Sequence, residues 1–182
     1  MKPVSRAEIV DFETYRETRE AYRAKVLALK APRRIHAGPL TFLFENHETI
    51  RYQVQEMTLA ERIVKDAEIS HELQTYNELL GGPGELGASL LIEIESAAER
   101  DEKLKAWLQL PRHLYARLED GTKVRPTFDA RQVGETRLSS VHYLKFDLNG
   151  RVPVAIGSDL PALMIEAPLT DPQRAALGED LS

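Results

Sequence analysis

The spacing of apolar residues changes at the run Gly81-Gly82-Pro83-Gly84, and this change constrains the fold more than any other feature. Before the run, apolar residues recur every three or four positions, which is typical of amphipathic helices; after it, they mostly alternate with polar residues, as in half-buried strands. The expected helices cover residues 13–30, about 47–64 and about 67–80, and a strand pair over 33–37 and 40–45 is expected between the first two. This order predicts an α+β protein in which N-terminal helices pack on a mainly antiparallel, meandering β-sheet.

Turn and capping residues divide the second half of the chain. Asp120-Gly121 and Asn149-Gly150 are both typical of type I′ hairpin turns, and the second is expected to join strands over 141–148 and 152–156. The capping-box spacing of Ser96-Ala97-Ala98-Glu99 predicts a helix that ends near Leu110.

The last elements are expected to be a strand over 162–166 and a short helix that opens at Asp171-Pro172 and ends just before Gly178. The sequence shows no internal repeat and no long flexible linker. It therefore predicts a single domain over residues 1–182, with a helical part over about 1–80 and a sheet-rich part over about 86–182.

Composition excludes several classes of chemistry. The 182 residues are 42% hydrophobic and 29% charged, which is ordinary for a folded domain. Because cysteine is absent, the chain itself supplies no disulfide, thiolate nucleophile or cysteine-held zinc or iron–sulfur centre. No apolar run approaches the ~18 residues of a membrane span, and no signal peptide is evident. With a net charge of −5, neither nucleic acid nor a membrane is expected as a partner, and a cytoplasmic location is expected.

Positive charge is concentrated near the N-terminus. Between Arg16 and His36 there are seven lysines and arginines and only two glutamates, so the rest of the chain is strongly acidic. The simpler interpretation is a solvated basic face that packs against the acidic remainder of the protein. The alternative is a surface for an acidic partner or an anionic ligand.

Three glutamates fall on helix faces that are otherwise apolar: Glu56 and Glu61 on the helix over 47–64, and Glu72 on the next helix. A carboxylate that is buried must be paired, bound to a metal or protonated. Arg19 lies on the apolar stripe of the first helix, which favours an internal ion-pair network with Arg19–Glu61 as the specific pair. The alternatives are a metal site of oxygen ligands, a general acid or base with a raised pKa, and a helix boundary that differs from the predicted one.

Six residues form the candidate ligand-binding set: Glu56, Glu61, Glu72, Tyr76, Arg19 and His71. Glu68-Ile69-Ser70-His71 matches the Glu-x-x-His element of di-iron bundles, which need two such elements, and the chain has only one. The segment 82–87 has the glycine spacing of a dinucleotide-binding loop, but a helix precedes it and a strand follows, in the reverse of the required order. His142 shares a strand face with Leu144 and Phe146, which is typical of a hydrogen-bonded core histidine. No catalytic residue, metal or cofactor is identified by these patterns.

Several phrases, specific in combination, resemble those of one family. They are Phe42-Leu43-Phe44-Glu45-Asn46, Gln53-Val54-Gln55-Glu56-Met57, Ala60-Glu61-Arg62-Ile63, His71-Glu72-Leu73-Gln74-Thr75-Tyr76-Asn77-Glu78-Leu79 and Gly82-Pro83-Gly84-Glu85-Leu86. With the Met1-Lys2-Pro3 opening, they resemble the bacterial family of unknown function DUF3501. The resemblance implies no assigned reaction, substrate or cofactor. It implies an association with rubrerythrin-like and iron–sulfur oxidoreductase proteins, and hence a redox- or peroxide-related setting with a protein partner in that pathway.

Three hypotheses for function follow. The first is a cytosolic accessory or ligand-binding protein centred on the six candidate residues. The second is a metal-dependent enzyme that uses the buried carboxylates, and the third is an interaction module that presents the basic N-terminal face. The sequence defines no oligomeric state.

Overall fold

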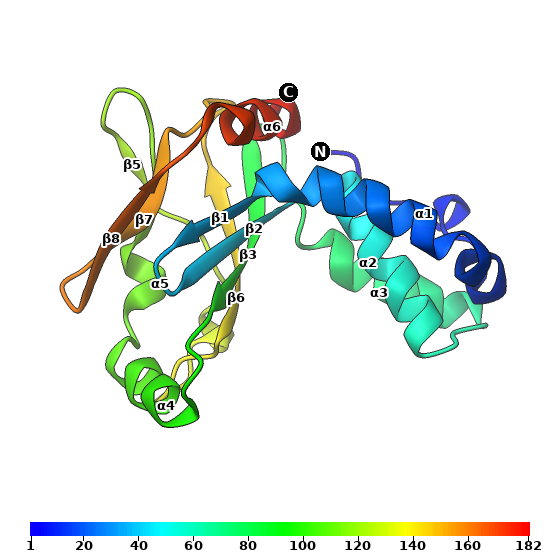
Figure 1. Ribbon diagram of the computed structural model, residues 1–182, viewed down its shortest axis with the longest axis horizontal. Coiled ribbons are helices and arrows are strands. Elements are labelled where there is room, and N and C mark those ends of the chain that lie inside the picture. The colour runs from blue at the N-terminus through cyan, green and yellow to red at the C-terminus, as the bar shows by residue number, and fades with distance from the viewer.

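The computed structural model describes residues 1–182, except for the side chain of Arg131. Figure 1 shows two lobes side by side, a helical lobe from the N-terminal part of the chain and a sheet lobe. The helical lobe contains a 3-10 helix η1 (Arg6–Glu8) and the helices α1 (Phe12–Lys30), α2 (His47–Ala60) and α3 (Asp66–Asn77). The α+β class predicted from the sequence is confirmed.

Eight strands form two antiparallel sheets rather than one meander. Sheet A has the strand order β1-β2-β3-β6 and sheet B the order β5-β4-β7-β8. The strands are β1 (Arg34–Ala37), β2 (Leu40–Glu45), β3 (Glu85–Ile92), β4 (Leu114–Arg117), β5 (Lys123–Val124), β6 (Val141–Asp147), β7 (Ala155–Leu160) and β8 (Leu163–Pro168). The remaining elements are the 3-10 helices η2 (Ala31–Arg33) and η3 (Ala130–Gln132) and the helices α4 (Ala97–Ala106), α5 (Leu110–His113) and α6 (Asp171–Leu181).

Helices α1 and α2 begin at residues that cap them. The carboxylate of Asp11 accepts hydrogen bonds from the amides of Glu13 and Thr14, and Asn46 accepts one from the amide of Thr49. Helix α2 ends at Ala60, four residues earlier than the periodicity predicts, because the chain turns at Arg62, which has a φ of 51°. This early end changes the environment of Glu61, as described below.

One predicted hairpin is confirmed and the other is wrong. Strands β4 and β5 pair through the turn at Asp120-Gly121, although only Gly121 of the two has a positive φ, so the turn is not type I′. Asn149 and Gly150 both have a positive φ (50° and 74°), as a type I′ turn requires, but the strands on either side of them lie in different sheets. The turn packs against the residue that precedes β3 instead, since the amides of Leu148 and Gly150 donate to the carbonyl of Gly84 at 3.1 and 3.2 Å.

The C-terminal helix also differs from its prediction. Gly178 lies inside α6, not beyond its end, and α6 continues to Leu181. A Cβ atom on Gly178 would lie 3.3 Å from a methyl carbon of Val152, so the glycine permits close packing of α6 on the chain below it. The helix is held by tertiary contact rather than ended by local backbone preference.

Each lobe has its own apolar core. In the sheet lobe, side chains from the facing surfaces of both sheets pack together with Leu104, Trp107 and Leu177 from the helices. In the helical lobe, a smaller core includes Ile50 and Val54 of α2. Helices packed on each other and sheets packed on each other therefore bury their apolar faces separately.

The lobes meet where the segment after α3 crosses the outer face of sheet A. A Cβ atom on Gly87 of β3 would lie 1.8 Å from the carbonyl oxygen of Leu79, so only glycine allows this approach of two backbones. Gly81 is constrained in the same way, with a Cβ 2.3 Å from the carbonyl oxygen of Glu85. The glycine-rich run that divides the sequence is thus the joint between the lobes.

A buried ion pair ties the end of the chain to the same region. The guanidinium of Arg33 in η2 donates to both carboxylate oxygens of Asp180 in α6, at 2.7 and 2.9 Å. Each of the two side chains is only 6% exposed. The side-chain amide of Asn46 donates to Asp180 as well, at 3.2 Å, which connects α6 to the start of α2.

Candidate functional site

The ion pair predicted for Arg19 exists and is half-buried, but its acidic partner is Glu56. Arg19 of α1 donates from Nε and a terminal nitrogen to the two oxygens of Glu56 on α2, at 2.8 and 2.7 Å. The hydroxyl of Tyr15 donates to the same carboxylate at 2.6 Å. The hydrogen bond from Arg19 lowers the pKa of Glu56, and burial beside that carboxylate raises the pKa of Tyr15. With both oxygens engaged, this carboxylate joins α1 to α2.

Glu61 does not belong to that network, and the expectation that it faces the core is wrong. It is the C-cap of α2 and is exposed. A helix that continued to about residue 64 would have placed it among apolar residues, but α2 ends at Ala60. Glu72 is half-buried and His71 exposed, and both line a shallow depression with Glu61. The structure therefore separates these three residues from Arg19 and Glu56.

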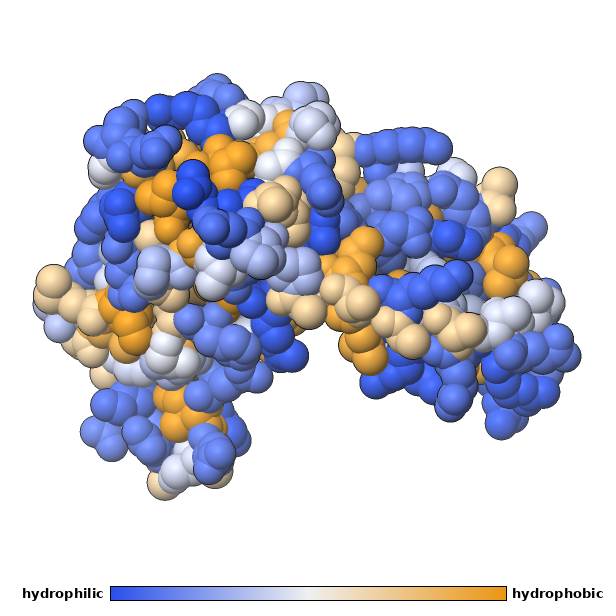
Figure 2. Space-filling view, turned by 45° about the horizontal axis from the view of Figure 1, so that its top comes forward, coloured by the Kyte–Doolittle hydropathy of each residue, from blue (hydrophilic) through white to orange (hydrophobic). Residues whose placement is uncertain are grey.

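Tyr76 lies in a third place, a groove between the lobes. One section of this interlobe groove has a volume of about 240 Å³. Helix residues Lys30, Ile50 and Tyr76 line one side. Leu91 of β3 and Tyr143 of β6, on the outer face of sheet A, line the other. Figure 2 shows the molecule hollowed between the lobes, with apolar atoms exposed where they meet.

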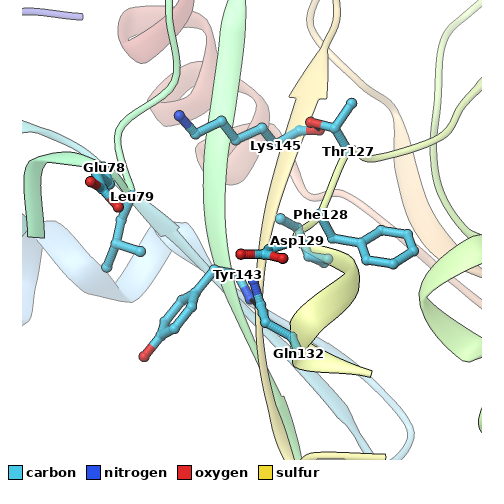
Figure 3. Close-up of a pocket in the computed structure, with 9 residues that line it drawn as sticks. Glu78, Leu79, Thr127, Phe128, Asp129, Gln132, Tyr143 and Lys145 are labelled. Carbon is cyan, nitrogen blue, oxygen red and sulfur yellow. Dashed lines mark hydrogen bonds between the residues drawn. The ribbon is translucent and has the colours of Figure 1, made fainter. Parts of the chain in front are cut away.

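A second section of the groove, with a volume of about 450 Å³, adjoins the first, and the two share Leu79 and Tyr143. It lies between the end of α3 and the loop before β6, and Figure 3 shows its walls. Its polar side chains are Glu78, Thr127, Asp129, Gln132, Tyr143 and Lys145. Pockets of some hundreds of cubic ångströms at the junction of structural units are typical ligand sites.

The loop before β6 is held against the strand edge by hydrogen bonds that take the place of a further strand. The backbones of Thr127 and Lys145 exchange two bonds at 2.8 and 2.9 Å, and the amide of Tyr143 donates to the side-chain oxygen of Gln132 at 2.7 Å. These bonds satisfy an edge that would otherwise be open. They also fix the loop as the far wall of the groove.

Strand β6 supplies exposed apolar groups to the groove. His142, Leu144 and Phe146 point into the core of the sheet lobe, so Val141, Tyr143 and Lys145 lie on the outer face. Val141 is 37% exposed and Tyr143 45% exposed. The sequence did carry this signal, since valine and tyrosine alternate with the core residues where polar side chains are expected on a solvated face.

His142 is the core histidine that the sequence predicts. It is fully buried, and its Nε2 lies 2.8 Å from the carbonyl oxygen of Ser139. Its Nδ1 has no hydrogen-bond partner among the described residues. Burial lowers the pKa of the imidazole.

Neither motif that suggested a bound cofactor forms a site. Glu85 closes the glycine turn on itself, because its carboxylate accepts a hydrogen bond from the amide of Gly82 at 2.9 Å, where a phosphate would otherwise bind. Glu68 and His71 are both exposed on α3. In the part of the chain that the structure describes, no group of three or more histidine, aspartate or glutamate side chains could hold a metal ion.

The predicted basic face is smaller than its charge count indicates. Arg33 is buried with Asp180, and Arg19 is held by Glu56, which leaves Arg16, Arg23 and Lys25 as exposed cations on α1. The face therefore presents fewer free charges to a partner.

A second charged cluster, which sequence analysis missed, lies on the outer face of sheet B. Arg117 makes a two-bond ion pair with Glu166 at 2.9 and 2.8 Å, and Arg125 makes one with Asp159 at 3.0 and 2.6 Å. Burial and a hydrogen bond to Glu166 raise the pKa of Tyr115 to about 12. Because these charges neutralise one another, we interpret the cluster as a solvated sheet face that is stabilised by pairs between strands.

None of the helices within the described residues combines the length and the apolar character that a bilayer span requires. The structure is thus an α+β protein with two lobes and a groove between them. Residues 3–181 match the model of DUF3501, described as a protein of unknown function, and the chain belongs to this family.

A search of curated proteins finds no match. Among solved structures, the chain is similar to that of a novel protein of unknown function from Burkholderia pseudomallei K96243, with 31% sequence identity and a TM-score of 0.88 over 100% of each chain.

Proposed function

We propose that this protein is a cytosolic accessory protein that binds a small organic ligand in the interlobe groove. The observation that supports the proposal is the exposure of Val141 and Tyr143 on a sheet face that forms one wall of that groove. Exposed apolar side chains gathered in a concavity mark binding surfaces more often than scattered ones do. Of the six residues proposed from the sequence, Tyr76 is the one that lines this groove.

The other hypotheses have less support. Glu56 has both oxygens engaged by Arg19 and Tyr15, so it offers little to a metal ion. The basic face predicted between Arg16 and His36 has lost two of its cations, Arg19 of α1 and Arg33 of η2, to internal ion pairs. The redox-related setting and its protein partner stay predictions from the family resemblance, since no contact of the groove bears on them.

Nile red, a neutral dye whose fluorescence rises in apolar surroundings, tests the proposal without favouring either charge. We expect saturable binding to the native protein and a loss of affinity of about fivefold or more in the double variant Val141→Ser/Tyr143→Ser. Met164→Ser is the matched control, because Met164 is 76% exposed on β8 and far from the groove. Absence of dye binding, or an equal loss in the control, contradicts the proposal.

A further inference from the structure

We propose that strand β8 is an interface through which two copies of this chain pair edge to edge. The pairing is antiparallel and joins sheet B of each copy into one continuous sheet about a two-fold axis. In Figure 1, β8 runs along the side of the sheet lobe that faces away from the helical lobe. The interface is therefore separate from the interlobe groove, and the two proposals stand or fall independently.

The direction of the backbone groups of β8 follows from its pairing with β7. The amide of Leu169 donates to the carbonyl of Val154 at 2.9 Å, just beyond the last register pair of the two strands. Hydrogen-bonded and non-hydrogen-bonded pairs alternate along an antiparallel ladder. The odd-numbered residues of β8 therefore bond to β7, whereas Met164 and Glu166 direct their amides and carbonyls away from it.

This outward edge has no partner within the part of the chain that the structure describes. No hydrogen bond engages the backbone groups of Met164 or Glu166. Pro168, which has no amide hydrogen to leave unpaired, occupies the next outward position. The strand contains no lysine, and its one charged side chain, Glu166, is neutralised by Arg117. The edge is thus open and is not protected by charge.

The other three sheet edges are protected. Strand β6 is covered by the loop before it, in which Thr127 exchanges two backbone hydrogen bonds with Lys145. In β1, the amide of Arg34 donates to Ala31, and its carbonyl accepts from the side chain of Gln173 at 3.3 Å. Strand β5 is only two residues long. Such devices prevent strands from pairing with other chains, so the exception at β8 indicates a strand that does pair.

The apolar core of the sheet lobe also ends incompletely at β8. Leu163, Ile165 and Ala167 pack against that core, but each is only half-buried. In the neighbouring strand β7, every residue except Asp159 is buried. A further strand beside β8 would cover the exposed part of the three side chains, and removing this apolar surface from water favours the pairing.

The edge is complementary to itself, which selects a second copy as the partner. With Ile165 on the two-fold axis, Met164 lies opposite Glu166 of the second copy, and each of the two equivalent pairs exchanges two backbone hydrogen bonds. Glu166 then faces an uncharged side chain. A shift in one direction would set the two Glu166 carboxylates against each other. A shift in the other direction would pair Glu166 with Ala162, which lies in the turn between β7 and β8.

Single cysteines test this register, because the chain contains none of its own. In Ile165→Cys the two Cβ atoms would lie about 4.5–5.5 Å apart, close to disulfide distance. In Met164→Cys they would be offset by two residues along the strands, beyond that distance. We expect diamide to link Ile165→Cys into a dimer about fivefold or more faster than Met164→Cys. Random collision predicts the reverse order, because Met164 is 76% exposed and Ile165 half-buried.

Sedimentation velocity between about 5 and 500 µM tests the association without a cross-link. We expect the mass of the wild type to rise toward that of a dimer over this range. Met164→Pro removes an outward amide and leaves the bonds to β7 intact, so it should raise the dissociation constant about tenfold or more. Met164→Ser keeps the amide and is the control at the same site, with a change of less than about threefold.

Charge at the same position tests the partner of Met164. Met164→Glu should weaken the dimer about fivefold or more, because the new carboxylate faces Glu166 of the second copy, whereas Met164→Lys should not weaken it. Circular dichroism and urea unfolding of each variant confirm that the monomer is folded. If Ile165→Cys does not fold, the sedimentation of the Met164 variants decides.

Three outcomes would overturn the proposal. A wild type that stays monomeric at about 500 µM leaves the edge to an extended segment of a different protein. Equal dissociation constants for Met164→Pro and Met164→Ser place the dimer interface elsewhere. Cross-linking of Met164→Cys that is as fast as that of a folded Ile165→Cys excludes the assigned pairing.

Discussion

At the scale of single residues, the contact between Arg19 and Glu56 joins the two long N-terminal helices. The guanidinium is 36% exposed and the carboxylate 21% exposed, so water screens part of the interaction. We expect Arg19→Met to lower the free energy of unfolding by about 1–2 kcal/mol, because Glu56 is left half-buried beside Tyr15. The double variant Arg19→Met/Glu56→Gln should recover part of this loss in urea denaturation.

The same pair makes a prediction about pH. Because the hydrogen bond from Arg19 lowers the pKa of Glu56 in the folded protein, the pair stabilises the fold fully above the ordinary pKa of 4.5. This stabilisation decreases as the pH falls below 4.5 and is lost as the pH passes through the lowered pKa of the folded state. The single variants Arg19→Met and Glu56→Gln should therefore approach the wild type in stability under acid conditions. Arg16→Met, an exposed arginine on the same helix, is the control. Purely additive losses in the double variant would show that the two residues do not act as a pair.

His142 gives a second residue-scale prediction with a different pH range. Its pKa is lowered by burial, so the folded state holds it neutral while the unfolded state takes up a proton below about 6.5. Stability should fall from pH 7 toward pH 5, with a slope of up to about 1.4 kcal/mol per pH unit. His142→Phe should remove this slope, as measured by urea unfolding at several pH values. If the free energy of unfolding of His142→Phe depends on pH as strongly as that of the wild type, the pH dependence comes from the other histidines.

Residue-scale prediction from the sequence worked where the helix was assigned correctly. Arg19 and Glu56 lie well inside α1 and α2, and helical periodicity placed both beside apolar residues, as the structure does. Glu61 was misplaced because its angular position was extrapolated past the real end of α2. Lys145 was not singled out, since a lysine on an alternating strand is usual and most residues that line its section of the groove come from other segments of the chain.

At the scale of elements, the junction of the lobes depends on glycine. A Cβ on Gly87 would overlap the carbonyl oxygen of Leu79. Both contacting segments are backbone, so no flexible side chain can move aside to relieve the overlap. We expect Gly87→Ala to destabilise the protein by about 2–3 kcal/mol, measured by urea denaturation. Gly178→Ala in α6 is the matched control, because its Cβ meets only a methyl group and alanine favours a helix. Equal stability of the two variants would mean that the lobes do not need this close approach.

The elements also show what a local turn signal can and cannot predict. Asn149-Gly150 adopts the backbone that its residue types favour, yet the flanking strands belong to different sheets. Dihedral preference is local, whereas strand pairing is decided by which apolar faces pack together over the whole chain. The division of the strands into two sheets therefore could not be obtained from turn residues alone.

At the scale of the whole molecule, Arg33 and Asp180 link segments that are 147 positions apart in the sequence. Removing one partner leaves the other charge buried, so Arg33→Met should cost about 3–5 kcal/mol in thermal or urea unfolding. The double variant Arg33→Met/Asp180→Leu should be more stable than the single one, because no unpaired charge remains. A single variant within about 0.5 kcal/mol of the wild type would show that the pair is not a structural connection.

The groove belongs to this scale, which is why the sequence did not predict it. Its walls come from the end of α3, the loop before β6 and the outer face of sheet A, and they meet only because Gly81 and Gly87 let the backbones touch. Sequence analysis found the glycines, Tyr76 and the strand of His142 separately. It could not bring them together, since long-range packing leaves no periodic signal in the chain.

The prediction of a single domain can be tested because the two lobes carry different probes. Trp107 reports on the core of the sheet lobe, while α1, α2 and α3 supply most of the helical signal in circular dichroism. The Arg33–Asp180 pair and the contact at Gly87 join the lobes, so we expect tryptophan fluorescence and ellipticity to follow one unfolding transition in urea. In Gly87→Ala the two curves should separate, with the helical lobe unfolding at lower urea because its core is the smaller of the two. Separate transitions in the wild type would mean that the lobes are independent folding units that happen to touch, and the groove between them would then change shape whenever one of them opened.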